Sequence, residues 1–340
     1  MKSVWRTLLV AGVLIAGAAG YAVSTARRSA RPVGFQVERV FVGQERPMSI
    51  GIWYPTSSTP RPTTLLGSTL MSVAPDGPVQ GHGLPLVVLS HGNGGSLASH
   101  LDLAMDLAAA GFVVAAPTHP GDNFADQGAA GSERLYSERA RQVRATLDYV
   151  LGAWRGHGQV DANRVGAFGF SAGAFTVLTL IGGRPDMAAI ATHCAASPEF
   201  ICKVLQQAGS ALLRHDGKAA AFAADHRIKA AIVAAPGLGF TFGHGGLGDV
   251  RVPVQLWVGD RDDRVPFATN GGIIRQGLAT QVEFHEAKGA GHLSFLSPCG
   301  MLGPPAMCSD AGGFDREAFH ALMNAAQVRF LVSHLRPRPR

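Results

Sequence analysis

The stretch from residue 164 to residue 181 constrains the fold of this 340-residue chain more than any other part. An apolar run at residues 164–168 is typical of a buried strand, and residues 174–181 are suited to a helix. Between them lies GFSAG, a G-x-S-x-G pattern centred on Ser171. Strand, tight turn and helix in this order predict a nucleophile elbow, in which the serine hydroxyl projects above a sheet and the flanking glycines let strand and helix approach closely.

Two other structures compete with the elbow for this short glycine-rich pattern. A dinucleotide-binding loop requires G-x-G-x-x-G and an acidic residue about 20 positions further on, and neither the glycine spacing here nor the RPD sequence at residues 184–186 fits it. An ordinary glycine turn in the core is the simpler alternative, because glycine and alanine are abundant in this chain. The residues further along the chain favour the elbow.

A serine nucleophile requires a base within hydrogen-bond reach and an acid that orients this base. In folds with an elbow, the chain order is serine, acid, histidine. Asp262 follows an apolar run at residues 254–259 in a G-x-x-D-x-x-V-P pattern and is the candidate acid, with Asp260 and Asp263 as alternatives. His292, in GAGHLSF, is the candidate base.

The remaining histidines near predicted strands are weaker candidates for the base. His285 lies inside a predicted short strand at residues 283–285, where it is expected to face solvent or the sheet. His119 follows the apolar run at residues 112–117 and is expected to line the pocket.

A tetrahedral oxyanion requires two preset backbone donors. The N–H of Ala172, directly after the serine, is one candidate. The other is the N–H of Asn93, in the HGNGG loop that follows an apolar run at residues 86–90. A plain glycine-rich turn is the alternative for this loop, and a phosphate cradle is disfavoured because no G-K-[ST] is present.

Strands that alternate with helices predict an α/β fold with a mostly parallel central sheet and helices on both faces. Right-handed crossovers would then bring the loops of Asn93, Ser171, Asp262 and His292 to one carboxyl edge. Residues 33–340 are expected to form one domain that opens with an antiparallel strand pair. The expected strands are 35–41, 47–54, 86–90, 112–117, 164–168, 228–235, 254–259 and 283–285, and the expected helices are 97–110, 132–154, 174–181 and 314–335.

Three further segments carry their own expectations. Residues 55–84 are rich in Pro, Ser, Thr and Gly and predict a long loop. The helix at residues 132–154 is expected to present Glu and Arg on its outer face. Residues 184–227 interrupt the alternation and predict a lid-like insertion over the active edge, with a surface subdomain that has no substrate contact as the alternative.

The formal charge of +6 comes partly from arginines near the two ends of the chain. Because no run of basic residues interleaves with aromatic residues in the middle, the composition argues against nucleic-acid binding. Residues 1–32 have the layout of a signal peptide: Lys2 and Arg6 precede an uncharged apolar run at residues 8–23, followed by more arginines. This run is short for a full membrane span. We therefore expect an exported protein, periplasmic or secreted, with a membrane anchor formed by the same segment as the alternative.

Four cysteines fit an oxidising compartment. They form two local pairs in turn-rich segments, Cys194 with Cys202 and Cys299 with Cys308, although four cysteines allow three connectivities. Neither spacing is C-x-x-C, so a zinc or redox site is disfavoured, and free buried thiols are the alternative.

Over about residues 35–335 the chain resembles bacterial α/β-hydrolases related to platelet-activating factor acetylhydrolase and to dienelactone hydrolase-like proteins. The stretches that carry the resemblance are residues 88–95, 108–116, 169–173 and 290–295. The chain departs from both relatives. In the acetylhydrolases the acid ends the strand before the one that precedes Asp262, and here that strand, residues 231–236, has no carboxylate; Asp262 matches the dienelactone hydrolase arrangement, but those enzymes use a cysteine nucleophile.

The resemblance implies a serine hydrolase of carboxylic esters, with a small-molecule ester as its partner and no metal or organic cofactor. Short acyl chains, above all acetyl esters of lipids, are the substrates that it implies. A peptidase on the same triad and a binding protein that has lost its chemistry are the two alternative functions.

Overall fold

The computed structural model describes residues 17, 20–21, 24–43, 47–67, 69–132, 134–214, 222–278, 282–299 and 305–336. Most of the predicted signal or anchor segment, residues 1–32, lies outside these residues. In the part of the chain that is described, no helix has both the length and the apolar character required to cross a membrane.

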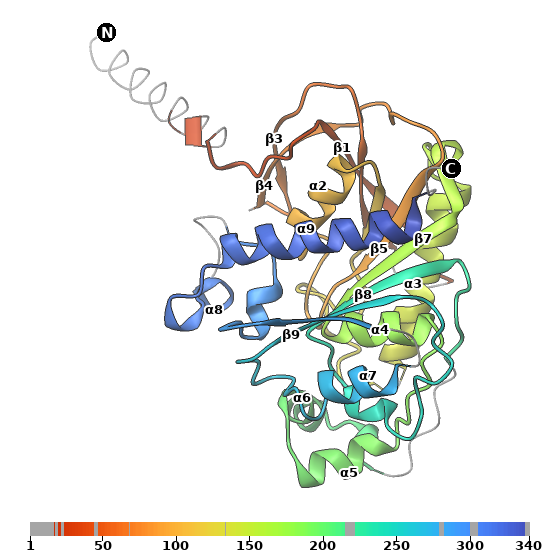
Figure 1. Ribbon diagram of the computed structural model, residues 1–340, viewed down its shortest axis with the longest axis vertical. Coiled ribbons are helices and arrows are strands. Elements are labelled where there is room, and N and C mark those ends of the chain that lie inside the picture. Colours follow the sequence, from red (N-terminus) through yellow and green to blue (C-terminus); the bar gives the residue numbers. More distant parts are fainter. Residues whose placement is uncertain are drawn as a thin grey trace.

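A ten-stranded sheet forms the centre of the molecule, with the order β10-β9-β8-β7-β5-β6-β2-β1-β4-β3 (Figure 1). The six strands from β10 to β6 are parallel, and β2 runs antiparallel to both β6 and β1. The predicted α/β fold and its N-terminal antiparallel pair are therefore confirmed. The strands are β1 (Val33–Val40), β2 (Met48–Pro55), β3 (Arg61–Leu65), β4 (Thr69–Pro75), β5 (Leu84–Ser90), β6 (Val113–Pro117), β7 (Val160–Phe170), β8 (Ile228–Ala234), β9 (Val254–Gly259) and β10 (Val282–Ala287).

The expectation of a long loop at residues 55–84 is wrong. Strands β3 and β4 pair antiparallel within this segment, and β4 adds to β1 in parallel, so that β3 forms the edge of the sheet. The alternation of residues 70–73, in which Met71 and Val73 are buried, carries the strand signal. This alternation is short, and the Pro and Ser residues of the surrounding segment are typical of a loop.

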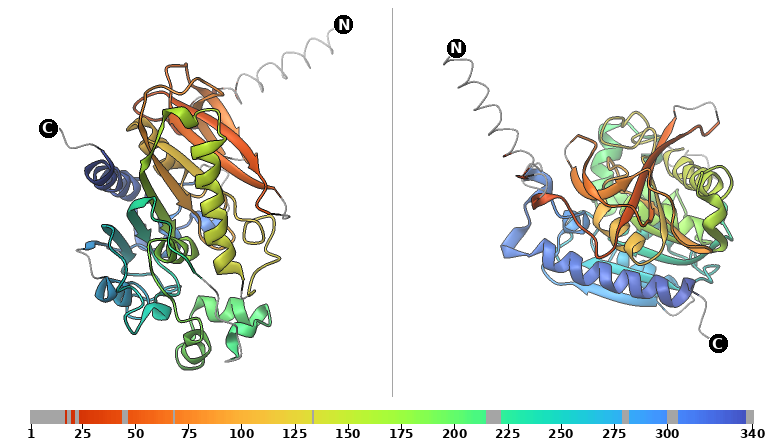
Figure 2. Two further views of the ribbon diagram at one scale, coloured as in Figure 1. Left: turned by 90° about the vertical axis from the view of Figure 1, so that its right-hand side faces the viewer. Right: turned by 90° about the horizontal axis from the view of Figure 1, so that it is seen from above.

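Helices cover both faces of the sheet (Figures 1 and 2). On one face α2 (Leu101–Ala109) packs against α9 (Arg316–Leu335), and on the other α3 (Leu135–Gly152) packs against α4 (Ala172–Leu180). Each face has its own apolar core, because successive side chains of a strand point to opposite sides. In β5, for example, Leu86 and Val88 belong to the core under α3 and α4, whereas Val87 and Leu89 belong to the core under α2 and α9.

Residues 184–227 leave the sheet and form α5 (Ala189–Ala196) and α6 (Phe200–Gln207), with residues 215–221 outside the described part. Cys194 of α5 is bonded to Cys202 of α6, and a second disulfide joins Cys299 to Cys308 in α8 (Pro305–Cys308), so the predicted local pairing is confirmed. Helix α7 (Gly271–Gly277) follows β9.

Candidate active site

Ser171 lies at the turn between β7 and α4 in a strained conformation. Its backbone has φ 55° and ψ −118°, a region that side-chain-bearing residues rarely adopt. The two flanking glycines are required by close backbone contacts. A Cβ atom at Gly169 would overlap the backbone of Gly173, and one at Gly173 would overlap the carbonyl of Ser90 at the end of β5. The strain and the close approach are the features that define a nucleophile elbow.

His292 and Asp262 lie beside this serine. The Nε2 atom of His292 is 3.0 Å from Ser171 Oγ, and its Nδ1 atom is 2.8 Å from Asp262 Oδ2. The imidazole and the carboxylate are both buried. Because Nδ1–H donates to the carboxylate, Nε2 is left as an acceptor for the serine hydroxyl.

The surroundings of the pair fix both side chains. Asp262 follows β9, and its second oxygen, Oδ1, accepts hydrogen bonds from the backbone N–H groups of Arg264 and Val265, each at 3.1 Å. His292 opens a short 3-10 helix after β10, and its ring packs on that of Phe170, with centroids 4.8 Å apart. Three strand ends of one sheet, those of β7, β9 and β10, therefore hold the three side chains.

The alternative acids and histidines lie elsewhere. Asp260 accepts a hydrogen bond from Gly289 N at 2.6 Å, and Asp263 is exposed. His285 pairs with Glu283 at 2.7 Å and stacks on Trp257.

The expectation that His119 lines the pocket is wrong. Its side chain is fully buried, with one ring nitrogen 2.9 Å from Ser90 Oγ and the other 2.8 Å from Gln142 Oε1. Burial lowers the pKa of His119 well below its ordinary value, and the nearby Arg139 charge adds to this effect, so the ring is neutral at pH 7.

The two candidate oxyanion donors lie on segments that pack against each other. Ala172 is the first residue of α4, and the first amides of a helix have no acceptor within it. The loop that carries Asn93 follows β5, the neighbour of β7 in the sheet. A Cβ atom at Gly92 of this loop would lie 3.2 Å from Ser171 Cβ, so the loop is in direct contact with the elbow.

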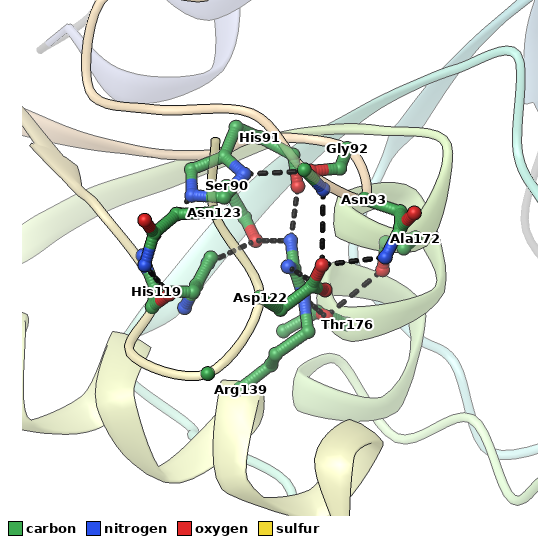
Figure 3. Close-up of polar contacts among 12 residues, drawn as sticks. Ser90, His91, Gly92, Asn93, His119, Asp122, Asn123, Arg139, Ala172 and Thr176 are labelled. Carbon is green, nitrogen blue, oxygen red and sulfur yellow. Dashed lines mark hydrogen bonds and ion pairs between the residues drawn. The ribbon is translucent and has the colours of Figure 1, made fainter. Parts of the chain in front are cut away.

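A buried ion pair beneath this loop has no counterpart among the expectations from sequence (Figure 3). Arg139 Nη1 of α3 lies 2.6 Å from Asp122 Oδ2 in the loop after β6, and both side chains are fully buried. The expectation that the arginines of this helix lie on its outer face is therefore wrong for Arg139. A signal was present, because Arg139 shares a helical face with the apolar residues Tyr136 and Val143.

His91, the first residue of the same loop, is a structural residue. Its Nδ1–H donates to Gly92 O at 2.6 Å, and its Nε2 accepts the backbone N–H of His119 at 3.0 Å. Burial lowers the pKa of His91 well below its ordinary value, and the charge of Arg139 lowers it further. The ring is therefore neutral at pH 7 and ties the loop after β5 to the loop after β6.

An open cavity of about 700 Å³ separates the Asn93 loop from α6. It is lined by Asn93, Gln127, Ala130, Phe200, Lys203, Val204, Gln207 and Ala208. The insertion therefore contributes one wall of a cavity that has Asn93 on its opposite side. Among the described residues, no group of three or more His, Cys, Asp or Glu side chains is arranged to hold a metal ion.

Comparisons with known proteins agree with the fold. Residues 62–149 match the family model of platelet-activating factor acetylhydrolase, isoform II. A solved structure of the ferulic acid esterase from Streptomyces cinnamoneus superposes with a TM-score of 0.63 at 20% identity, covering 93% of this chain and 95% of that one. No curated protein sequence matches the chain.

The structural likeness shows that the chain has the α/β-hydrolase fold. The family match covers β3 to α3 and includes the Asn93 loop, so within this segment the chain is similar to a family of ester-bond hydrolases.

Proposed function

We propose that this chain is a serine hydrolase of carboxylic esters, in which Ser171 is the nucleophile, His292 the general base and Asp262 the orienting acid. The observation that carries the proposal is the unbroken hydrogen-bond chain from Ser171 Oγ through His292 to Asp262, with distances of 3.0 and 2.8 Å. A strained serine at a strand-to-helix turn adds support, because such strain is uncommon outside functional sites.

The chemistry follows from the positions of these atoms. His292 Nε2 takes the proton of Ser171 as Oγ attacks the ester carbonyl, and Asp262 stabilises the imidazolium that forms. The backbone amides of Asn93 and Ala172 stabilise the oxyanion of the tetrahedral intermediate. His292 then donates its proton to the leaving alcohol, and the acyl group stays on Ser171. A water molecule that gives its proton to His292 releases the acid and restores the serine.

Small acyl esters are the substrates that we propose, acetyl esters of lipids among them. The family match and the sequence resemblance both support acetyl esters. The neighbouring solved structure is named as an esterase of ferulic acid, a larger aromatic acyl group, and the cavity beside Asn93 has room for either class. We assign this cavity to the acyl or alcohol part of the substrate, with α6 as the wall that selects its size.

We further propose that residues 33–340 are one catalytic domain, that residues 184–227 act as a lid-like insertion, and that residues 1–32 direct export or anchor the chain. The disulfides support export, because such bonds persist in oxidising compartments and are rare in the cytosol. The cavity wall formed by α6 supports the lid.

The experiment that tests the function is active-site labelling combined with an ester panel. Wild type should react with a fluorophosphonate probe and hydrolyse nitrophenyl acetate, and Ser171→Ala should lose both activities. Ser197→Ala, an exposed serine at the end of α5, is the matched control and should keep both. A folded wild type that neither reacts with the probe nor hydrolyses any ester would overturn the proposal. Faster cleavage of peptide amides than of esters would indicate the peptidase instead.

A further inference from the structure

The buried pair of Asp122 and Arg139 is not used by the proposed chemistry, although it lies next to it. Figure 3 shows the pair between the loop after β5 and the first turn of α4. Burying two charges removes their hydration, and a well-packed apolar pair at such a site is often equally stable or more so. Stability of the fold is therefore a weak explanation for this ion pair. The hydrogen-bond partners of the two charged groups indicate a different role.

One side of the pair holds the Asn93 loop. Asp122 Oδ1 accepts hydrogen bonds from Asn93 Nδ2 at 2.5 Å and from the backbone N–H of Gly94 at 3.0 Å. Glycines stand on both sides of Asn93, and Gly94 has a φ of +66°. A segment with this composition has little conformational preference of its own. The bonds to Asp122 therefore determine where the Asn93 backbone lies.

The other side of the pair holds the elbow. Arg139 Nε donates to Thr176 Oγ1 at 3.3 Å, and the Thr176 hydroxyl donates to the carbonyl of Ala172 at 3.0 Å. The guanidinium also donates, through Nη2, to the carbonyl of His91 and to Ser90 Oγ. A single planar cation thus contacts Thr176 of α4 and the end of β5 at the same time, and Thr176 carries the contact on to Ala172.

We propose that Asp122 and Arg139 are positioning residues that fix the distance between the Asn93 and Ala172 backbone amides, an inference that rests on the proposed function. Oxyanion stabilisation depends on donors that are in place before the charge develops. The two donors belong to different segments, and the ion pair joins these segments through hydrogen bonds to each. Both charged side chains are fully buried and do not contact the substrate. Their effect on catalysis is therefore limited to the positions of the Asn93 and Ala172 amides.

A matched pair of threonines on α4 tests this role without breaking the ion pair. Thr176 and Thr179 are both buried, and each hydroxyl donates to a carbonyl of its own helix, but the bond from Arg139 goes to Thr176. Thr176→Val should lower kcat for nitrophenyl acetate about tenfold and leave KM within about twofold. Displacement of a catalytic group by about 1 Å costs on the order of 100-fold, and the loss of this one hydrogen bond should move the Ala172 amide by less than that. Thr179→Val should change kcat by less than about twofold.

Asn93→Ala gives an independent second variant, because it removes one of the two hydrogen bonds from this loop to Asp122, that of the Asn93 side chain, and keeps the Asn93 backbone N–H. It should also lower kcat about tenfold. Both variants should bind an alkyl boronic acid more weakly by the same factor, because its tetrahedral adduct with Ser171 places an oxygen in the oxyanion hole. The double variant should lose less than the product of the two single losses, since both changes act on one hydrogen-bond network.

The outcomes separate this inference from the function on which it rests. Folded Thr176→Val and Asn93→Ala proteins with wild-type kcat and wild-type boronic acid affinity would overturn the positioning role and leave the esterase intact. Equal losses in Thr176→Val and Thr179→Val would also overturn it, since the effect would then belong to α4 as a whole. A wild type that hydrolyses no ester would overturn both proposals.

Discussion

Replacement of Asp262 by asparagine probes the proposed triad most directly, because the structure predicts how the amide would orient. Asp262 Oδ1 accepts two backbone N–H groups, whereas Oδ2 faces His292 Nδ1. An asparagine at this position keeps its carbonyl oxygen toward the two backbone donors, because an NH₂ group there would face N–H groups. Its NH₂ group is then directed at His292 Nδ1.

This orientation of the amide changes the tautomer of His292. An NH₂ donor at Nδ1 requires an unprotonated Nδ1, so the imidazole proton moves to Nε2, where it faces the Ser171 hydroxyl. The ring can no longer accept the serine proton. We expect kcat for nitrophenyl acetate to fall on the order of 10⁴-fold while KM and the fold are retained. Initial rates at saturating ester, with far-UV circular dichroism as the check on folding, measure this loss.

Two neighbouring aspartates provide the controls for this substitution. Asp263→Asn makes the same chemical change one residue away on an exposed side chain, and it should keep kcat within about twofold. Asp260→Asn should change kcat only slightly, since Asp260 accepts a hydrogen bond from the backbone N–H of Gly289, whereas the carboxylate that faces His292 is that of Asp262. A wild-type rate in Asp262→Asn, together with a large loss in either neighbour, would refute the assignment of the acid.

Two further predictions concern stability and selectivity. His100 is fully buried against Phe168 and Phe170, which lowers its pKa to about 3 from 6.5. Because the unfolded chain binds this proton first as the pH falls, the residue should cost the folded state about 2 kcal/mol between pH 7 and pH 5. His100→Phe should remove that share of the pH dependence in urea unfolding, and an unchanged dependence would contradict the pKa shift. Val204→Trp, on the cavity wall, should lower kcat/KM for an octanoyl ester about tenfold relative to the acetyl ester. Gln206→Trp, on the exposed side of α6, is its control, and equal effects of the two would remove the cavity from the substrate path.

The parts of the molecule that the sequence predicted correctly are those whose signal is local. The parallel strands are short apolar runs, and the elbow is a strand, a glycine-flanked serine and a helix in direct succession. Once these are placed on a parallel sheet, loop residues such as Asp262 and His292 fall at one edge, because every parallel strand ends there. The pairing of Cys194 with Cys202 is local in the same sense.

The parts that were missed depend on contacts between distant segments. Arg139 was expected on the surface because charged residues of helices usually lie there, and its acceptor, Asp122, is on a loop that carries no motif. The buried position of Arg139 follows from the helical face that it shares with apolar residues, whereas its charge alone predicts exposure. His119 was misplaced for a related reason, since its partners Ser90 and Gln142 come from two other elements.

The position of the proposed acid, Asp262, shows how a site of this kind can keep its geometry while the sequence pattern changes. The acetylhydrolases that this chain resembles carry their acid after the strand that corresponds to β8, and here β8 runs without a carboxylate into Ala235. Strands β8 and β9 are parallel neighbours whose pairing brings Ala234 opposite Trp257, so their carboxyl ends lie side by side. The loops that follow β8 and β9 therefore begin at nearly the same position on the edge of the sheet, and a carboxylate on either loop can lie near the histidine. What the chemistry requires is an acceptor at Nδ1 of the histidine, and in this chain the loop after β9 supplies it at 2.8 Å. In related structures, the acid should therefore be identified by its distance to the histidine and not by which strand precedes it.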